Sequence, residues 1–133
     1  MAKFDDSLVA VTSRSFSTNQ FLVKKLKESY PNVLLNLTGK TLKENELVKF
    51  LANADKAIVG IEIIDKDILD QLPKLKLISK YGVGLNNLDL GECKKRNIQI
   101  KFQPGSNKQS VAEFTLLLML NSLRQVHNNK TEI

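Results

Sequence analysis

The chain has 133 residues, which suits one domain with a hydrophobic core and is small for a two-domain enzyme. Apolar residues make up 42% of the sequence, and the longest apolar run, Leu116 to Leu120, is too short to cross a bilayer. The net charge of +6 is spread along the whole chain, with Lys94-Lys95-Arg96 as its one compact cluster, so it does not indicate a nucleic-acid partner.

The N-terminus and the cysteine content bear on the location of the protein and on its disulfide bonds. Residues 1–6 contain no apolar stretch typical of a secretion signal, so we expect a cytoplasmic protein without a membrane partner. Cys93 is the only cysteine, which excludes an internal disulfide. It lies in a helix-like stretch without the features of a nucleophile, and we interpret it as structural.

Strand-like and helix-like segments alternate along the chain. Short runs rich in Val, Ile and Leu indicate strands, and apolar residues spaced by three and four indicate helices. The expected strands are 8–12, 33–37, 57–61, 75–81 and 98–102. The expected helices between them are 21–30, 41–51, 65–69 and 89–97, and residues 13–18 are a Ser- and Thr-rich loop.

Several helix ends carry recognisable signals. Thr41 with Glu44, and Asp89 with Glu92, have the spacing of a reciprocal capping box. Asn97 is suited to a left-handed stop after the second of these helices. These signals divide the chain into regular units of strand, loop and helix.

This alternation favours an α/β fold. Strands apolar enough to be covered on both faces, joined by helices, predict a parallel sheet between two helical layers with right-handed crossovers. We therefore expect a flavodoxin-like three-layer sandwich with a five-stranded parallel sheet, ending in a long crossover helix. The strand order does not follow from the sequence, although 2-1-3-4-5 is the common solution for this size.

The last predicted helix is the most apolar one. It opens at Ser110, which forms a capping box with Glu113. At about 100° per residue, the apolar run in this helix points to almost every side, so one sheet face is not able to bury it. We expect the 110–125 surface to bind a second copy or a missing domain. The expected organisation is a domain at 1–109, the helix at 110–126 and a polar tail at 127–133.

Ligands of open parallel sheets gather at the carboxyl ends of the strands. There, Gly82 and Gly84 permit positive φ and a close approach of backbone amides to a carboxylate or phosphate. Taken alone, Gly-x-Gly is more often a tight strand-to-helix turn. Here it stands within the longer motif Lys80-Tyr81-Gly82-Val83-Gly84-Leu85-Asn86-Asn87-Leu88-Asp89, which Asn107-Lys108-Gln109-Ser110-Val111-Ala112-Glu113 follows.

Together these motifs resemble those of D-isomer-specific 2-hydroxyacid dehydrogenases of the D-3-phosphoglycerate dehydrogenase type. The family has a similar G-[VI]-G-x-D-x-[IV]-D loop, and N-x-x-S-V-A-E at the start of a long helix. The resemblance covers about 8–126 and implies the substrate-binding half of an NAD- or NADP-dependent oxidoreductase. It implies substrate contacts at Tyr81, Gly82, Val83, Gly84 and Asn107, and nicotinamide-side contacts at Lys108 and Val111.

Some features of the family are missing from this sequence. Asn86 stands where the family usually has Asp, which removes a charge beside the loop. Asn87 stands where the dinucleotide fingerprint would have its third glycine. The resemblance places the NAD-binding turn and the catalytic Arg, Glu and His in a second domain beyond residue 133. His127, the only histidine, has no carboxylate at a fixed spacing.

We therefore expect the isolated chain to contain no catalytic residue and no metal site, to bind no cofactor, and to be inactive in hydride transfer. A non-catalytic binding or regulatory module derived from the same domain fits the sequence equally well. A flavin binder is a third alternative, in which the loop at 12–18 would hold a phosphate. The absence of tryptophan for stacking on a flavin ring argues against it.

Overall fold

The computed structural model describes residues 5–124 of the chain. They fall into two compact units, one up to Gln103 and one from Pro104 onward, and each is described by itself. No helix among these described residues is long and apolar enough to cross a membrane. The predicted polar tail at 127–133 lies outside the described residues.

The first unit is built on a five-stranded parallel sheet with the order β2-β1-β3-β4-β5. This is the 2-1-3-4-5 order common in domains of this size, and it confirms the predicted fold class. In the register, Ala10 of β1 lies opposite Leu34 on one side and Ala57 on the other. The strands are β1 Val9–Val11, β2 Val33–Leu35, β3 Lys56–Val59, β4 Leu77–Lys80 and β5 Gln99–Lys101.

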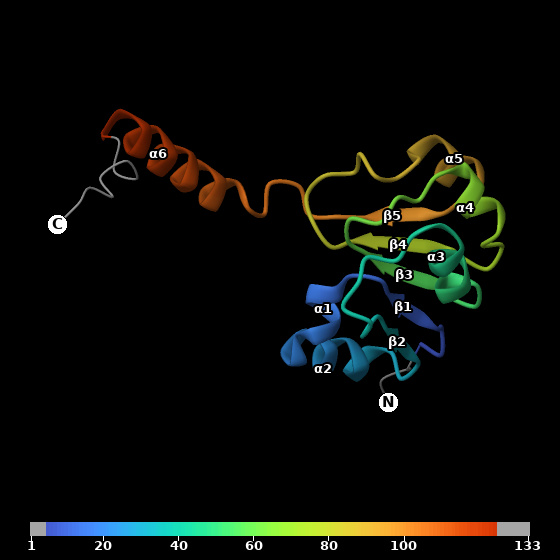
Figure 1. Ribbon diagram of the computed structural model, residues 1–133. Helices are drawn as coiled ribbons and strands as arrows, with labels where there is room; N and C mark the ends of the chain where they lie inside the picture. The colour runs from blue at the N-terminus through green and yellow to red at the C-terminus, as the bar shows by residue number, and fades with distance from the viewer. Residues whose placement is uncertain (1–4, 125–133) are drawn as a thin grey trace. The chain divides into compact units, whose positions relative to one another are not determined.

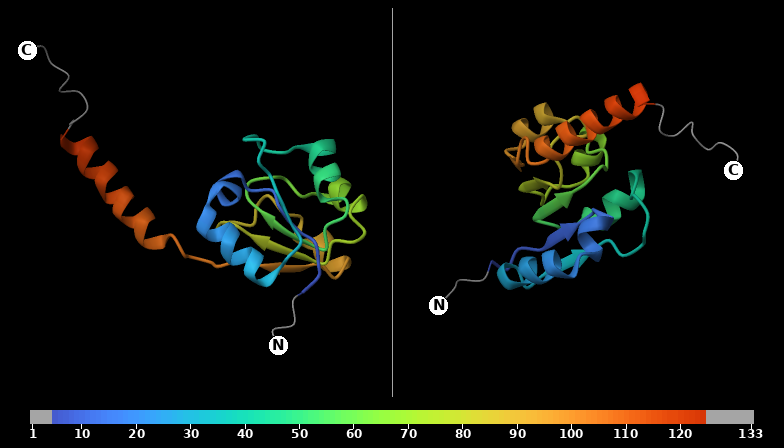
Figure 2. Two further views of the ribbon diagram at one scale, coloured as in Figure 1. Left: turned by 90° about the horizontal axis from the view of Figure 1, so that it is seen from below. Right: turned by 90° about the vertical axis from the view of Figure 1, so that its left-hand side faces the viewer.

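Helices cover both faces of this sheet, as Figures 1 and 2 show, with α1 and α2 on one face and α3, α4 and α5 on the other. Right-handed crossovers produce this division, because the chain moves in one direction from β1 to β2 and in the other from β2 through β5. The helices are α1 Arg14–Thr18, α2 Gln20–Ser29, α3 Glu44–Leu51, α4 Lys66–Asp70 and α5 Leu90–Lys95.

In the first unit, the structure differs from the prediction at residues 14–18 and at the start of α3. Residues 14–18, expected to be loop, form the short helix α1, because the Ser13 hydroxyl accepts a hydrogen bond from the amide of Phe16 and caps it. The capping box predicted at Thr41 and Glu44 is wrong. The N-cap of α3 is Lys43, which makes no side-chain capping bond, and Glu44 is the first helical residue with a φ of 43°.

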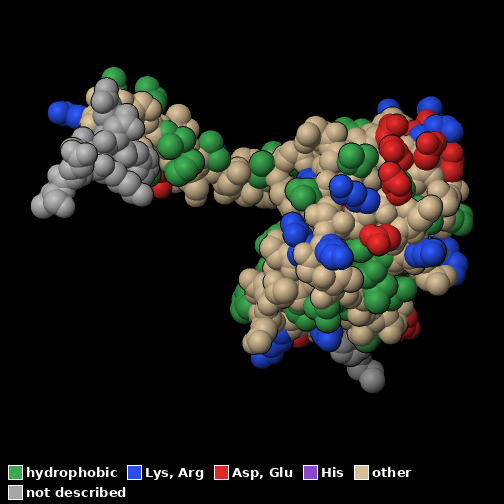
Figure 3. Space-filling view, in the orientation of Figure 1, with side chains coloured by type: hydrophobic (Ala, Val, Ile, Leu, Met, Phe, Trp, Pro, Cys, Tyr) green, Lys and Arg blue, Asp and Glu red, His purple; other side chains and the backbone are tan. Residues whose placement is uncertain are grey.

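The signals around α5 are largely confirmed. Asp89 Oδ1 accepts a hydrogen bond from the amide of Glu92 at 2.9 Å, and Asn97 has a left-handed φ of 57°. The reciprocal half of this box is absent from the structure, because the Glu92 carboxylate pairs with Lys95 and Arg96 instead. Arg96 also pairs with Asp70. Figure 3 shows acidic and basic side chains close together at the end of the molecule where α4 and α5 lie in Figure 1. The paired cations lower the pKa of both carboxyls.

The hydrophobic core lies between the sheet and the layer of α3, α4 and α5. Alternate residues of β3 and β4 are fully buried there, Ala57, Val59 and Ile78, whereas Ile58 and Leu77 on the other face are only partly buried. Cys93 also belongs to this core, and burial raises the pKa of its thiol. Its position supports the structural interpretation of this cysteine.

Among its described residues, the second unit contains one helix, α6, at Lys108–Arg124. It begins before Ser110, so the predicted cap at Ser110 is wrong: this residue lies inside the first turn, and Glu113 pairs with Gln109 instead. The large apolar side chains of α6 are exposed around its circumference. They are Val111, Phe114, Leu116, Leu117, Leu118, Met119, Leu120 and Leu123.

Replacing Ile78 by Ala should destabilise the first unit strongly, because the side chain is fully buried and its loss leaves a cavity. We expect the free energy of unfolding to fall by about 3 kcal/mol in chemical denaturation. The matched change Ile63→Ala, at an exposed position, should cost less than about 0.5 kcal/mol. Equal losses for the two variants would contradict this placement of the core.

Candidate functional site

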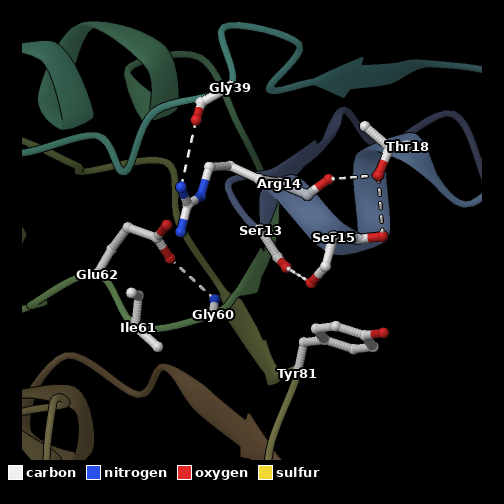
Figure 4. A pocket seen from close by; sticks show the side chains of 9 residues that line it. All are labelled: Ser13, Arg14, Ser15, Thr18, Gly39, Gly60, Ile61, Glu62 and Tyr81. Carbon is white, nitrogen blue, oxygen red and sulfur yellow. Dashed lines mark hydrogen bonds between the residues drawn. The ribbon is translucent and has the colours of Figure 1, made fainter. Parts of the chain in front are cut away.

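A cavity of about 380 Å³ lies at the carboxyl-end edge of the sheet in the first unit. Four segments that are distant in sequence line it, as Figure 4 shows: Ser13, Arg14, Ser15 and Thr18 after β1, Gly39 after β2, Gly60 to Glu62 after β3, and Tyr81 after β4. They meet because parallel strands end at the same edge.

Glu62 is the most buried charged residue of this cavity, with 3% of its surface exposed. Its Oε2 accepts hydrogen bonds from the Thr12 hydroxyl at 2.7 Å and from the amide of Gly60 at 2.9 Å. Within the described part of the chain, no Lys or Arg nitrogen lies within 4.0 Å of this carboxylate. A buried carboxylate without an ion pair is costly, so the surrounding loops must hold it by hydrogen bonds.

Arg14 is exposed and projects from the start of α1 into the same cavity. One of its guanidinium nitrogens, Nη1, donates a hydrogen bond to the carbonyl oxygen of Gly39 at 3.2 Å. The cavity therefore has both a fixed hydrogen-bond acceptor in Glu62 and a cationic donor in Arg14.

The glycine loop, residues 82–84, follows directly on Tyr81. Gly82 has a φ of 143°, a conformation that side-chain-bearing residues rarely adopt. The amide of Tyr81 still belongs to the sheet and donates to the carbonyl of Val59 at 2.8 Å. Among residues 5–124, the next three amides, those of Gly82, Val83 and Gly84, donate to no protein acceptor. Successive free amides of this kind provide a binding site for an anion.

Two polar side chains attach the glycine loop to the loop after β3. Lys80 Nζ donates to the carbonyl of Gly60 and, at 2.8 Å, to Asn87 Oδ1. Asn87 Nδ2 donates to the carbonyl of Glu62 at 2.6 Å, and the Asn87 carbonyl accepts from the amide of Ile64 at 2.8 Å. Partial burial lowers the pKa of Lys80, while the neighbouring Glu62 carboxylate opposes this shift.

The structure divides the predicted site residues between the two units. Tyr81 and the glycine loop lie together beside the cavity, with the Tyr81 ring edge-on to Phe16 at a centroid distance of 5.4 Å. Asn107, Lys108 and Val111 lie near one another in the second unit, where the Asn107 carbonyl accepts from the amide of Val111 at 3.0 Å.

Sequence reasoning missed the roles of Glu62, Lys80, Asn87 and Thr12. Lys80 and Asn87 flank the glycines within the quoted motif, and a polar residue directly after a buried strand is a usable signal for Glu62. Their hydrogen-bond partners, however, follow other strands, so the spacing of residues in the sequence did not reveal these contacts.

The glycine loop does not fit the dinucleotide turn that binds NAD, and the described residues offer no metal site. Asn87 replaces the third glycine of a dinucleotide turn, and its side chain is already bonded to Lys80 and Glu62. Across residues 5–124, no group of three or more His, Cys, Asp or Glu side chains could hold a metal ion. The features that remain are those of a binding site for a small polar or anionic molecule.

Comparison with known proteins agrees with the sequence motifs. Residues 9–131 match the family model of the D-isomer specific 2-hydroxyacid dehydrogenase catalytic domain. The chain belongs to this family. It is similar to a hydroxypyruvate reductase of Thermotoga maritima, with 32% identity over 93 residues, or 69% of this chain and 30% of that protein. A glyoxylate reductase of Thermofilum pendens is 41% identical over 82 residues, or 61% of this chain and 24% of that protein.

Solved structures of other proteins share the fold of this chain. The NAD⁺-bound 3-phosphoglycerate dehydrogenase of Entamoeba histolytica aligns with a TM-score of 0.76 at 22% identity, covering 97% of this chain and 43% of that one. The TT0316 protein of Thermus thermophilus aligns with a TM-score of 0.74 at 29% identity, covering 90% of this chain and 38% of that one. The chain spans less than a third of the two curated relatives named above.

Replacing Asn87 by Ala should loosen the attachment of the glycine loop, because the Glu62 carbonyl and Lys80 both lose a partner. Amide hydrogen exchange should become faster at Ile64 and Asp89, whose amides bond across these loops. We expect about a tenfold increase, from the loss of a hydrogen bond contributing roughly 1 to 1.5 kcal/mol. Asn86→Ala is the matched control. Equal exchange rates at Ile64 and Asp89 in the two variants would contradict the role of Asn87 in attaching the glycine loop.

Proposed function

We propose that this chain is the substrate-binding part of an NAD-dependent D-2-hydroxyacid dehydrogenase, and that it holds the carboxylate of a 2-hydroxy or 2-oxo acid at Gly82, Val83 and Gly84. The observation that carries the proposal is the run of three amides without a protein acceptor, next to the cavity and on a loop fixed by Lys80 and Asn87. Preorganised amides stabilise an anion without having to reorient when it binds.

The names of the relatives support a small acid as the ligand. Glyoxylate, hydroxypyruvate and phosphoglycerate, the compounds in these names, all carry a carboxylate next to an oxygen-bearing carbon. Among the predicted contacts, Tyr81 and the glycine loop would bind the carboxylate side. By resemblance to the family, Asn107 would be a further substrate contact, and Lys108 and Val111 would be nicotinamide-side contacts.

The chemistry itself requires parts that the described residues do not provide. When bound, NAD supplies the hydride acceptor or donor, and a positioned acid-base group must move the proton. Residues 5–124 contain no histidine and no dinucleotide turn. We propose that the isolated chain binds its acid without turning it over, and that the apolar α6 associates with an NAD-binding domain or with a second copy. A cytoplasmic location is part of the same proposal.

Titration of the isotope-labelled chain with D-lactate or D-glycerate tests the carboxylate site. We expect the amide NMR signals of Gly82, Val83 and Gly84 to shift in a saturable manner, because a bound carboxylate changes their hydrogen bonding. D-Lactamide, which has the size of D-lactate and no charge, should leave these signals in place. Shifts confined to other residues would contradict the proposed site.

Gly82→Ala should weaken this binding by about tenfold, because a Cβ at a φ of 143° strains the loop and moves its amides. Gly91→Ala in α5 is the matched control and should bind normally, since its new Cβ would meet Asp89 only at 3.4 Å. The affinities are compared by NMR titration at constant ionic strength. Unchanged affinity in Gly82→Ala would remove the loop from the proposed site.

The isolated chain, mixed with NAD and a series of D-2-hydroxy acids, should form no NADH above the uncatalysed rate. The reason is that hydride transfer needs a bound nicotinamide and an acid-base group held against the substrate. Absorbance at the NADH band is the measurement. Steady turnover by the purified chain would show that its own residues complete the active site.

A further inference from the structure

The cavity contains the charged carboxylate of Glu62, which has no role in the proposed binding of a substrate carboxylate by the glycine loop. Glu62 is almost completely buried, and only its Oε2 accepts hydrogen bonds, from Thr12 and Gly60. A glutamine amide oxygen would accept the same two bonds without the cost of a desolvated charge. The fold therefore requires an acceptor at this position but not a carboxylate.

The other oxygen of Glu62 is not enclosed by the protein. Within residues 5–124, Glu62 Oε1 accepts no hydrogen bond, and it is not among the fully buried unpaired atoms, so it reaches accessible space. Arg14 faces the same space, and only Nη1 of its guanidinium donates to a described residue. The cavity thus presents an acceptor and a cationic donor to the same ligand.

We propose that Glu62 and Arg14 form a subsite that selects acids with an uncharged hydroxyl group on C3, such as hydroxypyruvate or D-glycerate. The inference rests on the proposed function, since it places the substrate carboxylate at the adjacent glycine loop. Tyr81 lines the cavity together with Glu62 and Arg14 and is bonded directly to Gly82, so the glycine loop continues from the wall of the subsite.

The chemistry of the substituent decides between possible substrates. A hydroxyl group both donates and accepts, so it donates to Glu62 Oε1 and accepts from Arg14. A phosphate has strong acceptors for Arg14 but places like charge against the buried Glu62 carboxylate, which is unfavourable. An ammonium group has the opposite conflict with Arg14. A hydrogen atom or a methyl group leaves both polar groups without a partner.

Calorimetric or NMR titration of the full 133-residue chain with three acids tests the subsite. D-Glycerate carries the hydroxyl, D-lactate replaces it by hydrogen, and D-3-phosphoglycerate replaces it by a phosphate ester. We expect D-glycerate to bind at least about tenfold more tightly than either of the others, at constant pH and ionic strength.

Glu62→Gln keeps the acceptor for Thr12 and Gly60 and removes the charge. The ratio of the D-glycerate affinity to the D-3-phosphoglycerate affinity should fall by about tenfold, because the repulsion of the phosphate is relieved. Glu28→Gln, on the exposed end of α2, removes the same charge away from the cavity and should leave the ratio unchanged.

Arg14→Gln is a second variant for which folding is not at risk, because Arg14 is exposed. It should lower the D-glycerate affinity by about fivefold while the thermal midpoint stays the same. Equal affinities of the native chain for all three acids, or an unchanged ratio in Glu62→Gln, would overturn the subsite and leave the carboxylate site standing. Absence of any shift at Gly82 to Gly84 with all three acids would overturn both.

Discussion

The carboxyl ends of β1, β3 and β4 meet at one edge of the sheet, and the polar groups buried there need hydrogen-bond partners. Thr12 and the amide of Gly60 find theirs in the Glu62 carboxylate, and the carbonyls of Gly60 and Glu62 find theirs in Lys80 and Asn87. A buried polar group without a partner costs more than a hydrogen bond normally contributes, so these bonds hold the loops in one arrangement. The shape of the cavity depends on this pairing.

These hydrogen bonds fix both ends of the glycine loop and leave the backbone amides between them without an acceptor. Tyr81 still bonds into the sheet and Asn87 is bonded on several sides, whereas the amides of Gly82 to Gly84, between them, donate to no acceptor in the described chain. A rigid loop with unused donors loses little conformational entropy when an anion binds. This arrangement suits the recognition of a carboxylate, and it requires glycine at the position with positive φ.

The proposed function separates substrate binding from the chemistry of the reaction. The core of the first unit lies between the sheet and α3 to α5, and its cavity has polar groups suited to an acid. The second unit contributes α6, and residues 104–124 contain no other helix or strand for its apolar side chains to pack against. Members of the family bring a nicotinamide to the substrate, and the relatives named above are more than three times as long as the part matched here. The proposed function therefore assigns recognition of the acid to this chain and hydride transfer to a complete protein.

Local sequence patterns determined the fold class, the position of the sheet and the glycine loop, because hydrophobic periodicity and glycine conformation depend on residues close together in the chain. They also determined the family, through motifs that lie within one continuous loop and one helix. Helix starts were less predictable: Thr41 and Ser110 each have a Glu three residues later, as in a capping box, yet neither residue is the N-cap of its helix.

Only the tertiary structure decided the details of the site. Thr12 and Glu62 are 50 residues apart, and Gly60 and Lys80 are 20 apart, so their contacts exist only because β1, β3 and β4 are neighbours in the sheet. The pairing of Glu62 with neutral donors, and the presence of Arg14 in the same cavity, follow from that adjacency. The sequence alone identified the glycine loop as a candidate for binding an acid, and the packing of the strands determined which other groups lie around it.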